Sequence, residues 1–311
     1  MLDPELAPLI ALASDPPTES GRQSPMMAAL LAGPQPVSEA VETRQVMISG
    51  FGAAPDVRAL LYLPRHSEAL RGAVLHIHGG GYISGAPEMA AASNLAIAEA
   101  LGVVVLSVDY RLAPTTKYPG AVDDCHAALG WLHRHSGELT VDPQRIAVSG
   151  ESAGGGLTAA LALMARDQRS YPIAFQHLIY PMIDDRTAID PDISPFVGQF
   201  VWTQASNLLG WTALLDCPPG SDQVSHYAAA ARADDLSGLP PTFIACGALD
   251  LFVDENIDFA RRLIRSGVPT ELHVYPGAPH GFQFVKNSGV AQLAARDSLL
   301  ALGKALAVRA T

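Results

Sequence analysis

A serine lies between two glycines, in the sequence G-E-S-A-G at residues 150–154, which follows the short apolar run of residues 146–148. A strand that turns at once into a helix strains the backbone, and the residues two positions on either side of the serine must be small. Gly150 and Gly154 meet this demand, and such a turn directs the first free N–H groups of the helix toward the Ser152 hydroxyl. The stretch predicts a strand–turn–helix unit with Ser152 as nucleophile; the alternative is an ordinary glycine-rich loop.

Two further side chains supply what a serine nucleophile needs. A hydroxyl group becomes reactive when a histidine takes its proton and a carboxylate orients that histidine. Asp250 follows the apolar segment 241–246, and His280 follows the alternating segment 270–275, so each is expected just past the end of a strand. The chain order of serine, aspartate and histidine is the order found in α/β-hydrolases. Ser152, Asp250 and His280 are therefore the predicted catalytic residues.

Two other acids compete for the role of Asp250. Asp254 and Glu255 follow it closely, but both lie where the next helix is expected to begin. Acidic side chains in a first helical turn favour the helix dipole, which accounts for them without a catalytic role.

A glycine triplet offers the hydrogen-bond donors that an acyl-transfer reaction needs. The sequence H-G-G-G at residues 78–81 follows an apolar strand-like segment at 73–77. Glycines can turn their N–H groups inward without steric cost, and the predicted oxyanion-hole donors are Gly80, Gly81 and Ala153. A phosphate-binding loop is disfavoured, because no Lys-Ser or Lys-Thr pair follows and no G-x-G-x-x-G opens a helix.

Five motifs in this order resemble those of the hormone-sensitive lipase family, the bacterial family IV esterases of the α/β-hydrolase superfamily. They are H-G-G-G at 78–81, D-Y-R-L-A-P at 109–114, G-E-S-A-G-G at 150–155, D-L-F-V-D-E at 250–255 and H-G-F at 280–282. The resemblance implies a capped hydrolase of carboxylic esters with short to medium acyl chains, without a cofactor, and a homodimer formed through the last strand and helix. Glu151, where the family often has Asp, and Thr115, where it often has Glu, depart from the pattern.

The alternation of strand-like and helix-like segments predicts the fold class. An α/β fold is expected, with a mostly parallel, doubly wound, eight-stranded sheet flanked by helices. Its core would comprise residues 43–183 and 231–311, and residues 1–42 and 184–230 would form a helical cap. Apolar side chains of the cap are the predicted substrate-binding residues, although for any single aromatic residue packing of the cap onto the body is favoured, because most such side chains are core. These residues are Met26, Phe196, Phe200, Trp202 and Trp211.

The composition narrows the range of expected binding partners and cellular locations. A formal net charge of −11 disfavours binding to nucleic acid or to anionic membranes, so a small ester is the expected partner. Asp3 and Glu5 give the N-terminus the wrong charge for a signal peptide, and no apolar run reaches the ~18 residues of a membrane span, which predicts a cytoplasmic protein. Three widely spaced cysteines predict free thiols and no metal site.

Two other functions fit the same residues. One is a non-catalytic receptor on the capped fold, which the filled catalytic positions disfavour. The other is an acyltransferase or amide hydrolase with the same three residues. It differs from an esterase only in whether the cap lets water or a second nucleophile reach the acyl-enzyme.

Overall fold

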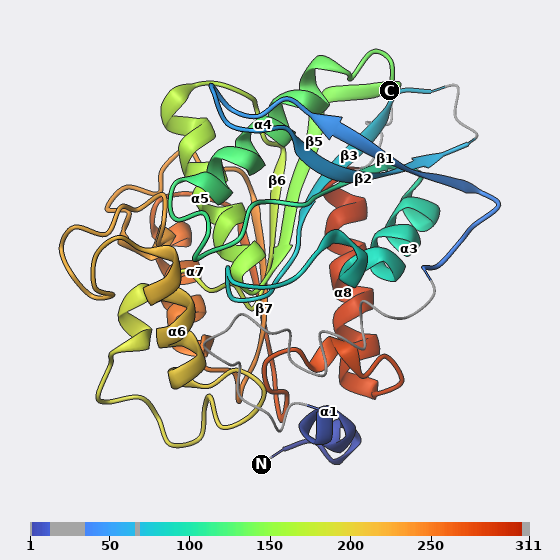
Figure 1. Ribbon diagram of the computed structural model, residues 1–311. Helices are drawn as coiled ribbons and strands as arrows, with labels where there is room; N and C mark the ends of the chain where they lie inside the picture. Colours follow the sequence, from blue (N-terminus) through green and yellow to red (C-terminus); the bar gives the residue numbers. More distant parts are fainter. Residues whose placement is uncertain (1, 13–34, 66–68, 307–311) are drawn as a thin grey trace.

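The computed structural model describes residues 2–12, 35–65 and 69–306, and its centre is one eight-stranded sheet (Figure 1). The strand order is β1-β2-β4-β3-β5-β6-β7-β8. The strands are β1 (Val41–Ile48), β2 (Val57–Pro64), β3 (Arg71–Ile77), β4 (Val104–Val108), β5 (Val141–Glu151), β6 (Phe175–Ile179), β7 (Thr242–Gly247) and β8 (Thr270–Tyr275). Only β2 runs against its neighbours, and every pair from β4 across to β8 is parallel. The predicted mostly parallel sheet is confirmed.

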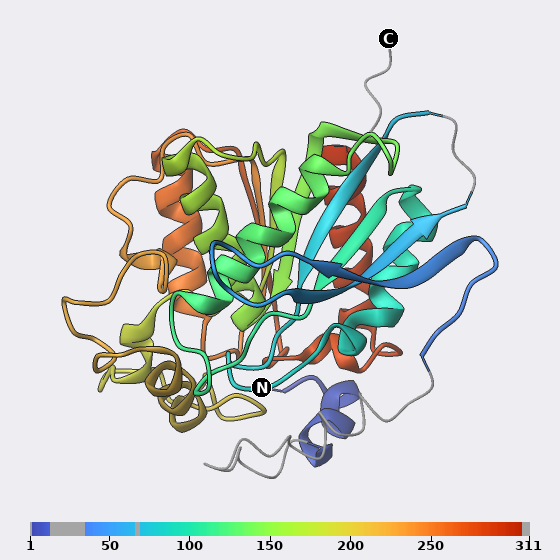
Figure 2. The same ribbon diagram turned by 45° about the horizontal axis from the view of Figure 1, so that its top comes forward.

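Helices cover both faces of the sheet, as a doubly wound fold requires. Figures 1 and 2 show α3 and α8 on one face and α4, α5 and α7 on the other. The helices are α3 (Ala91–Leu101), α4 (Gly120–Arg134), α5 (Ala153–Gln168), α7 (Val253–Arg265) and α8 (Gly289–Leu306). Because parallel strands joined by helices alternate with them in sequence, the strand ends that lead into helices all meet at one edge of the sheet.

Side chains of alternate residues along each strand enter two different cores. Leu75 and Val148 pack toward α4 and α5, whereas Val74 and Ala147 pack toward α3 and α8. Both faces of the central strands are apolar, so these strands read as continuous apolar runs in the sequence.

The segment between β6 and β7 contains little regular structure besides α6 (Gln204–Leu214). It also holds two short 3₁₀ turns, η3 (Asp185–Ala188) and η4 (Ala230–Arg232). Figures 1 and 2 show α6 beyond the end of the sheet, beside the loops that follow the strands. Its position agrees with a cap, while the domain boundaries at 184–230 stay a prediction.

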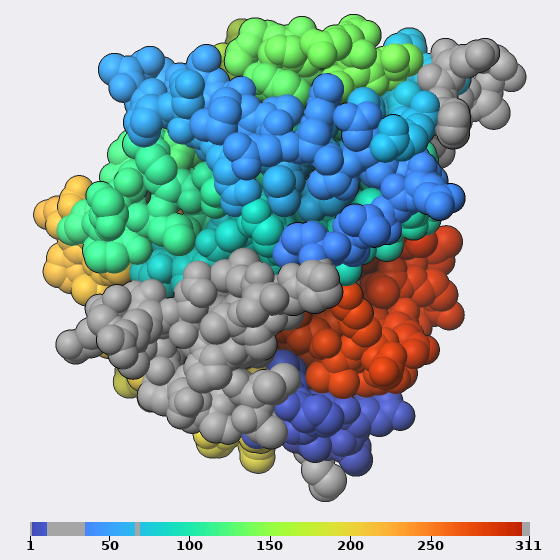
Figure 3. Space-filling model, turned by 45° about the vertical axis from the view of Figure 1, so that its right-hand side comes forward, coloured from blue at the N-terminus to red at the C-terminus, as the bar shows by residue number. Residues whose placement is uncertain are grey.

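The N-terminal residues lie at the same end of the molecule. η1 (Pro4–Leu6) and α1 (Ala7–Leu12) rest against the C-terminal part of the chain, as the dark blue and red surfaces in Figure 3 show. The Asp3 N–H donates to the Gly277 carbonyl at 3.0 Å, and the Gly289 N–H donates to the Glu5 carboxylate at 2.6 Å. The expected first cap segment, residues 1–42, is thus described only in part, and it includes the start of β1 at Val41.

No helix within the described residues combines the length and the apolar character that crossing a membrane demands.

Candidate active site

Ser152 stands alone between the end of β5 and the start of α5, with φ 55° and ψ −121°. The residues two positions before and after it must be glycine for a steric reason. A Cβ atom on Gly150 would lie 2.3 Å from the Gly154 carbonyl oxygen, and one on Gly154 would lie 2.0 Å from that of Ile77. Both distances are far inside van der Waals contact, so the sharp turn tolerates no larger residue at either position. The expected strand–turn–helix unit is present.

Three side chains from separate strand ends meet in series. His280 Nε2 lies 2.9 Å from Ser152 Oγ, and His280 Nδ1 lies 2.8 Å from Asp250 Oδ2. Asp250 follows β7 and His280 follows β8, and all three side chains are buried. With a carboxylate accepting at Nδ1, the imidazole carries its proton there and presents a free lone pair to the hydroxyl. This arrangement can remove a proton from Ser152.

The competing acids are directed elsewhere. Asp254 is exposed on the first turn of α7. Glu255 is buried, and its carboxylate accepts from the backbone N–H groups of Ile183 and Asp184 at 2.8 and 3.2 Å. Burial raises the pKa of Glu255 well above its ordinary value. Glu255 therefore ties the start of the cap segment to α7 and does not contact His280.

Aromatic rings surround the imidazole of His280 on several sides. The ring centroids of Tyr180 and Phe252 lie 4.5 and 5.3 Å from that of His280. The Tyr180 hydroxyl donates to Gln283 Oε1 at 3.0 Å, so it also holds the loop that carries His280. Sequence reasoning missed both aromatic residues; their signal was an aromatic side chain at the end of β6 and another two residues beyond Asp250.

The glycine triplet follows β3 and lies against the serine turn. Gly80 and Gly81 have φ values of 127° and 61°, a region in which residues with a side chain are strained. A Cβ atom on Gly81 would lie 2.2 Å from the ring of Trp202. Within the described part of the chain, the N–H groups of Gly80, Gly81 and Ala153 donate to no loop or turn acceptor. These donors are available to a bound oxygen atom.

His78 braces this loop. Burial lowers the pKa of His78 to about 4, so the ring is neutral at pH 7. Its Nδ1 lies 2.8 Å from the Gly79 carbonyl oxygen, which can only accept, and Nδ1 therefore carries the proton. The ring stacks on Tyr110 at 4.3 Å, and the Tyr110 hydroxyl donates to the His78 carbonyl at 3.0 Å. The backbone leading into the glycines is fixed on both sides.

The predicted substrate-binding side chains have different surroundings. Trp202 contacts the glycine loop, and its ring centroid lies 6.3 Å from that of His280. Trp211 is fully buried with its centroid 5.2 Å from that of Tyr82, an environment that favours packing. Phe196 is 74% exposed and Phe200 is half-buried. Met26 lies outside the described residues.

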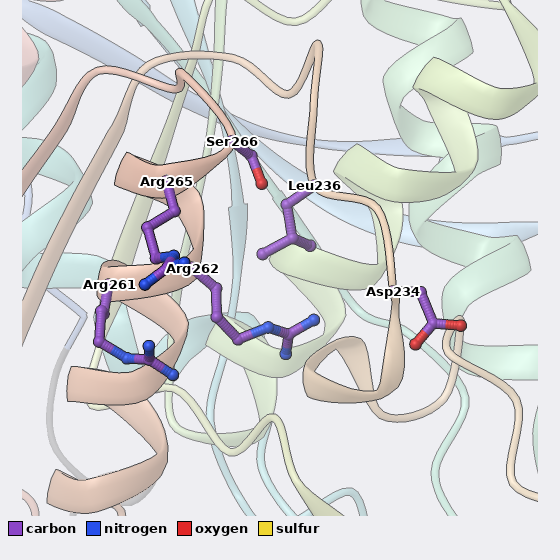
Figure 4. A pocket seen from close by; sticks show the side chains of 6 residues that line it. All are labelled: Asp234, Leu236, Arg261, Arg262, Arg265 and Ser266. Carbon is purple, nitrogen blue, oxygen red and sulfur yellow. The ribbon is translucent and has the colours of Figure 1, made fainter.

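A separate cavity of about 410 Å³ lies between the end of α7 and the loop after η4. It is lined by Asp234, Leu236, Arg261, Arg262, Arg265 and Ser266 (Figure 4). The Arg262 guanidinium already donates to the carbonyls of Ala231 and Ala233. Arg262 therefore fastens this loop to α7, and the cavity contains none of the three residues in series.

Within residues 2–12, 35–65 and 69–306, no group of three or more His, Cys, Asp or Glu side chains is arranged to hold a metal ion. His76 and His78 do not converge. His76 bonds to Ser107 and Glu151, whereas His78 bonds to Gly79.

A serine, a histidine and an aspartate in series at the strand ends of a doubly wound sheet define the α/β-hydrolase class. The chain belongs to the α/β-hydrolase fold family, whose family model matches residues 74–284. The resemblance inferred from the five motifs is confirmed.

Similar proteins are named as esterases. The solved structure of a bacterial heroin esterase is 37% identical, covers 99% of this chain and 98% of its own, and superposes with a TM-score of 0.91. Carboxylesterase NlhH of Mycobacterium tuberculosis is 35% identical over 78% of this chain and 75% of its own. An arylesterase of Saccharolobus solfataricus is 31% identical over 80% of this chain and 82% of its own.

Proposed function

We propose that this protein is a serine carboxylesterase that hydrolyses small carboxylic esters by acyl transfer through Ser152. The observation that carries the proposal is the pair of contacts made by His280, at 2.9 Å to Ser152 and 2.8 Å to Asp250. The esterase names of similar proteins along most of the chain support the same reaction.

In the first step, His280 Nε2 takes the proton of Ser152 as Oγ attacks the ester carbonyl carbon. The carbonyl π electrons move to oxygen and give a tetrahedral oxyanion. When this intermediate collapses, the C–O bond to the alcohol breaks and His280 returns the proton to the departing alkoxide. The products of this step are a free alcohol and an acyl group on Ser152, while Asp250 stays ionised and stabilises the imidazolium.

In the second step, water replaces the alcohol. His280 removes a proton from water as its oxygen attacks the acyl carbon, and the proton passes to Ser152 Oγ when the ester bond to the enzyme breaks. The carboxylic acid leaves and the free serine is restored.

The proposed oxyanion hole consists of the N–H groups of Gly80, Gly81 and Ala153. Each donor removed from such a site typically costs about 10²–10³ in kcat, because the donors are oriented before the charge develops. The free N–H groups and the left-handed backbone of the two glycines support this assignment.

The proposed substrates have acyl chains of short to medium length. Trp202 lies over Gly81 and near His280, so a bulky ring borders the space next to the reacting atoms. Phe196, Phe200, Trp211 and Met26 stay predictions as substrate-binding residues, and so does the absence of a cofactor.

Hydrolysis of p-nitrophenyl esters from acetate to palmitate tests the proposal, with Ser152→Ala as the control. We expect turnover that is highest for the shorter chains and a loss of at least ~10⁴-fold in the variant. Turnover that survives in Ser152→Ala would refute the mechanism. A p-nitroanilide substrate and an added acceptor alcohol separate amide hydrolysis and acyl transfer from ester hydrolysis.

The proposed homodimer forms through β8 and α8. β8 is the last strand of the sheet and pairs only with β7 among the described strands, which leaves one edge for a second copy. Light scattering measures the mass in solution, and a monomer at all concentrations would exclude the dimer. The cytoplasmic location stays a prediction.

A further inference from the structure

Two charged or polar side chains meet directly beside the serine turn. His76 Nε2 lies 3.0 and 3.1 Å from the two carboxylate oxygens of Glu151, and His76 Nδ1 lies 2.8 Å from Ser107 Oγ. The imidazole is buried, whereas the carboxylate is 26% exposed. The mechanism proposed above uses neither side chain. Their position next to Ser152 calls for an explanation.

The contact lies where two strands separate. The backbone register of β3 and β5 ends with Ile77 opposite Gly150. Beyond this point β3 continues into the glycine loop, and β5 continues through Glu151 into Ser152. The His76–Glu151 contact therefore joins a β3 residue that still pairs with β5, opposite Ser149, to the first β5 residue past the pairing, at the base of both reactive segments.

The two segments approach each other closely just above this link. A Cβ atom on Gly79 would lie 3.0 Å from the Glu151 carbonyl oxygen and 3.4 Å from Ser152 Cβ. The glycine loop thus lies against the backbone of residues 151–152. A change in how β5 ends would move Ser152 relative to the donors of Gly80 and Gly81.

The chemistry of the contact suits a fixed link. Burial raises the pKa of Glu151, but its electrostatic interaction and hydrogen bond with His76, together with weaker interactions with His177 and His78, outweigh burial, and the pKa lies below its ordinary value. An ionised carboxylate only accepts, so His76 Nε2 is the donor in this bond. Hydrogen bonds to an ionised group are about twice as strong as neutral ones.

We propose that Glu151 and His76 are positioning residues, whose bond sets the distance between Ser152 and the oxyanion donors of Gly80 and Gly81. The inference rests on the proposed acyl transfer at Ser152. Oxyanion donors act on the charge that develops in the transition state, so a loss of alignment lowers kcat and leaves KM nearly unchanged.

The test measures kcat and KM for p-nitrophenyl butyrate in Glu151→Ala, His76→Ala and the double variant. We expect kcat to fall about 10- to 100-fold in each, since small misplacements of reacting groups have effects of this size. KM should stay within about twofold, and the double variant should lose no more than the worse single variant, because both changes break one bond. Glu151→Gln keeps an acceptor for His76 and should retain most of kcat.

A trifluoromethyl ketone supplies a second readout, because it adds to the serine and leaves an oxyanion. Its inhibition constant should rise in parallel with the fall in kcat. Thermal melting profiles equal to that of the wild type show that the variants fold. If His76→Ala does not fold, His76→Gln replaces it in the test.

The matched control is Glu271→Ala, which removes the acid from another His–Glu contact, at 2.7 Å to His273 on β8. It should leave kcat unchanged. The inference is wrong if kcat of Glu151→Ala stays within twofold, if KM rises as kcat falls, or if the two single losses multiply in the double variant. Persistent turnover in Ser152→Ala would instead overturn the proposed function, so the two failures are distinguishable.

Discussion

The strand-end loops and the cap segment hold their side chains in different ways. At the strand ends, Ser152, Asp250 and His280 are each placed by the last residues of a strand, and their polar atoms meet at 2.8 and 2.9 Å. In the segment between β6 and β7, α6 is the longest regular element. That segment exposes large apolar side chains, 51% for Ile189 and 74% for Phe196.

Several separate contacts fasten the segment between β6 and β7 to the body, among them the bonds of the Glu255 carboxylate at its start. Asp185 is fully buried and pairs with Arg232 at 2.6 Å, and Trp211 is fully buried against Tyr82. The comparison teaches that converging strand ends hold the predicted catalytic residues, whereas the segment proposed as a cap is held by separate contacts spread along its length. Changes at the strand ends should therefore alter the rate of reaction, and changes in the cap should alter stability or preference.

Loss of the Asp250 charge should have the largest effect. Asp250→Asn removes the acceptor that orients His280, and we expect kcat to fall about 10⁴-fold. The matched control, Asp254→Asn, changes an exposed acid on the first turn of α7 and should retain most activity. Initial rates on p-nitrophenyl butyrate measure both. Activity that is lost in Asp254→Asn and kept in Asp250→Asn would show that Asp254, and not Asp250, is the acid that orients His280.

The buried cap anchor should affect stability next most strongly. Asp185→Ala leaves the Arg232 guanidinium without its carboxylate, and we expect the free energy of unfolding to fall by about 3–5 kcal/mol. Urea denaturation measures the change. Asp258→Ala, which breaks an exposed pair with Arg261, should cost less than about 1 kcal/mol. Similar losses in both variants would contradict the role of Asp185 as an anchor.

A methyl group at Gly81 should disturb the oxyanion loop. Its Cβ atom would lie 2.2 Å from the Trp202 ring, so Gly81→Ala must shift the loop, and we expect kcat to fall about 10²–10³-fold. Gly102 is a matched control, because its φ of 63° is nearly the same as the 61° of Gly81 and no atom lies within 4 Å of its added Cβ. Gly102→Ala should leave kcat unchanged. Equal losses would mean that backbone strain alone is responsible.

An acidic pH should lower the stability of the folded sheet through a buried histidine. Burial lowers the pKa of His177, on β6, from 6.5 to about 4. Between these values the unfolded chain binds a proton that the folded chain does not, so stability falls as the pH falls. From pH 7 to pH 5 this histidine should contribute a loss of about 2 kcal/mol.

Urea denaturation of the wild type and of His177→Gln at both pH values checks this expectation. The wild type should lose more stability than the variant. The raised pKa of Glu255 makes the folded state more stable as the pH falls, which is opposite to the effect of His177. Because Glu255 is present in both proteins, its influence cancels when their losses between pH 7 and pH 5 are compared. An equal loss in both proteins would show that His177 does not carry the effect.

Substitutions of the aromatic residues in the proposed cap should have the smallest effect. They should change the preference for acyl chain length and leave the mechanism intact. Trp202→Leu should change the ratio of kcat/KM for octanoate and acetate esters by about fivefold, roughly 1 kcal/mol. Phe196→Leu, at a side chain 74% exposed, should change the ratio less than about twofold. If neither variant shifts the ratio, the cap segment does not border the acyl chain.

Sequence reasoning reached the features that depend on neighbours along the chain. Alternation of apolar segments indicated the sheet, because both faces of its central strands are buried. The glycines around Ser152 indicated the sharp turn, because local sterics demand small residues there. Element ends were less accurate: β5 begins at Val141, five residues before the apolar run 146–148 from which the strand was predicted. Pro143 falls within it, and the register with β3 shifts between Arg71 and Ala73.

The features that sequence reasoning missed arise between distant segments. Tyr180 and Phe252 contact His280 only because three strand ends converge. The bond between His76 and Glu151 joins residues 75 positions apart, and the sequence showed only that Glu151 departs from the family pattern. Contacts between distant segments leave no repeating pattern in a single amino-acid sequence from which they could be predicted.

Covalent labelling tests the central claim most directly. Diethyl p-nitrophenyl phosphate should form a phosphorus–oxygen bond with Ser152 Oγ and release one equivalent of p-nitrophenolate per chain, with the serine proton passing to His280. Peptide mass mapping should place the diethylphosphoryl group on Ser152, in step with the loss of esterase activity, and His280→Ala should react far more slowly. A label on another residue, or full activity in protein labelled completely at Ser152, would contradict the account.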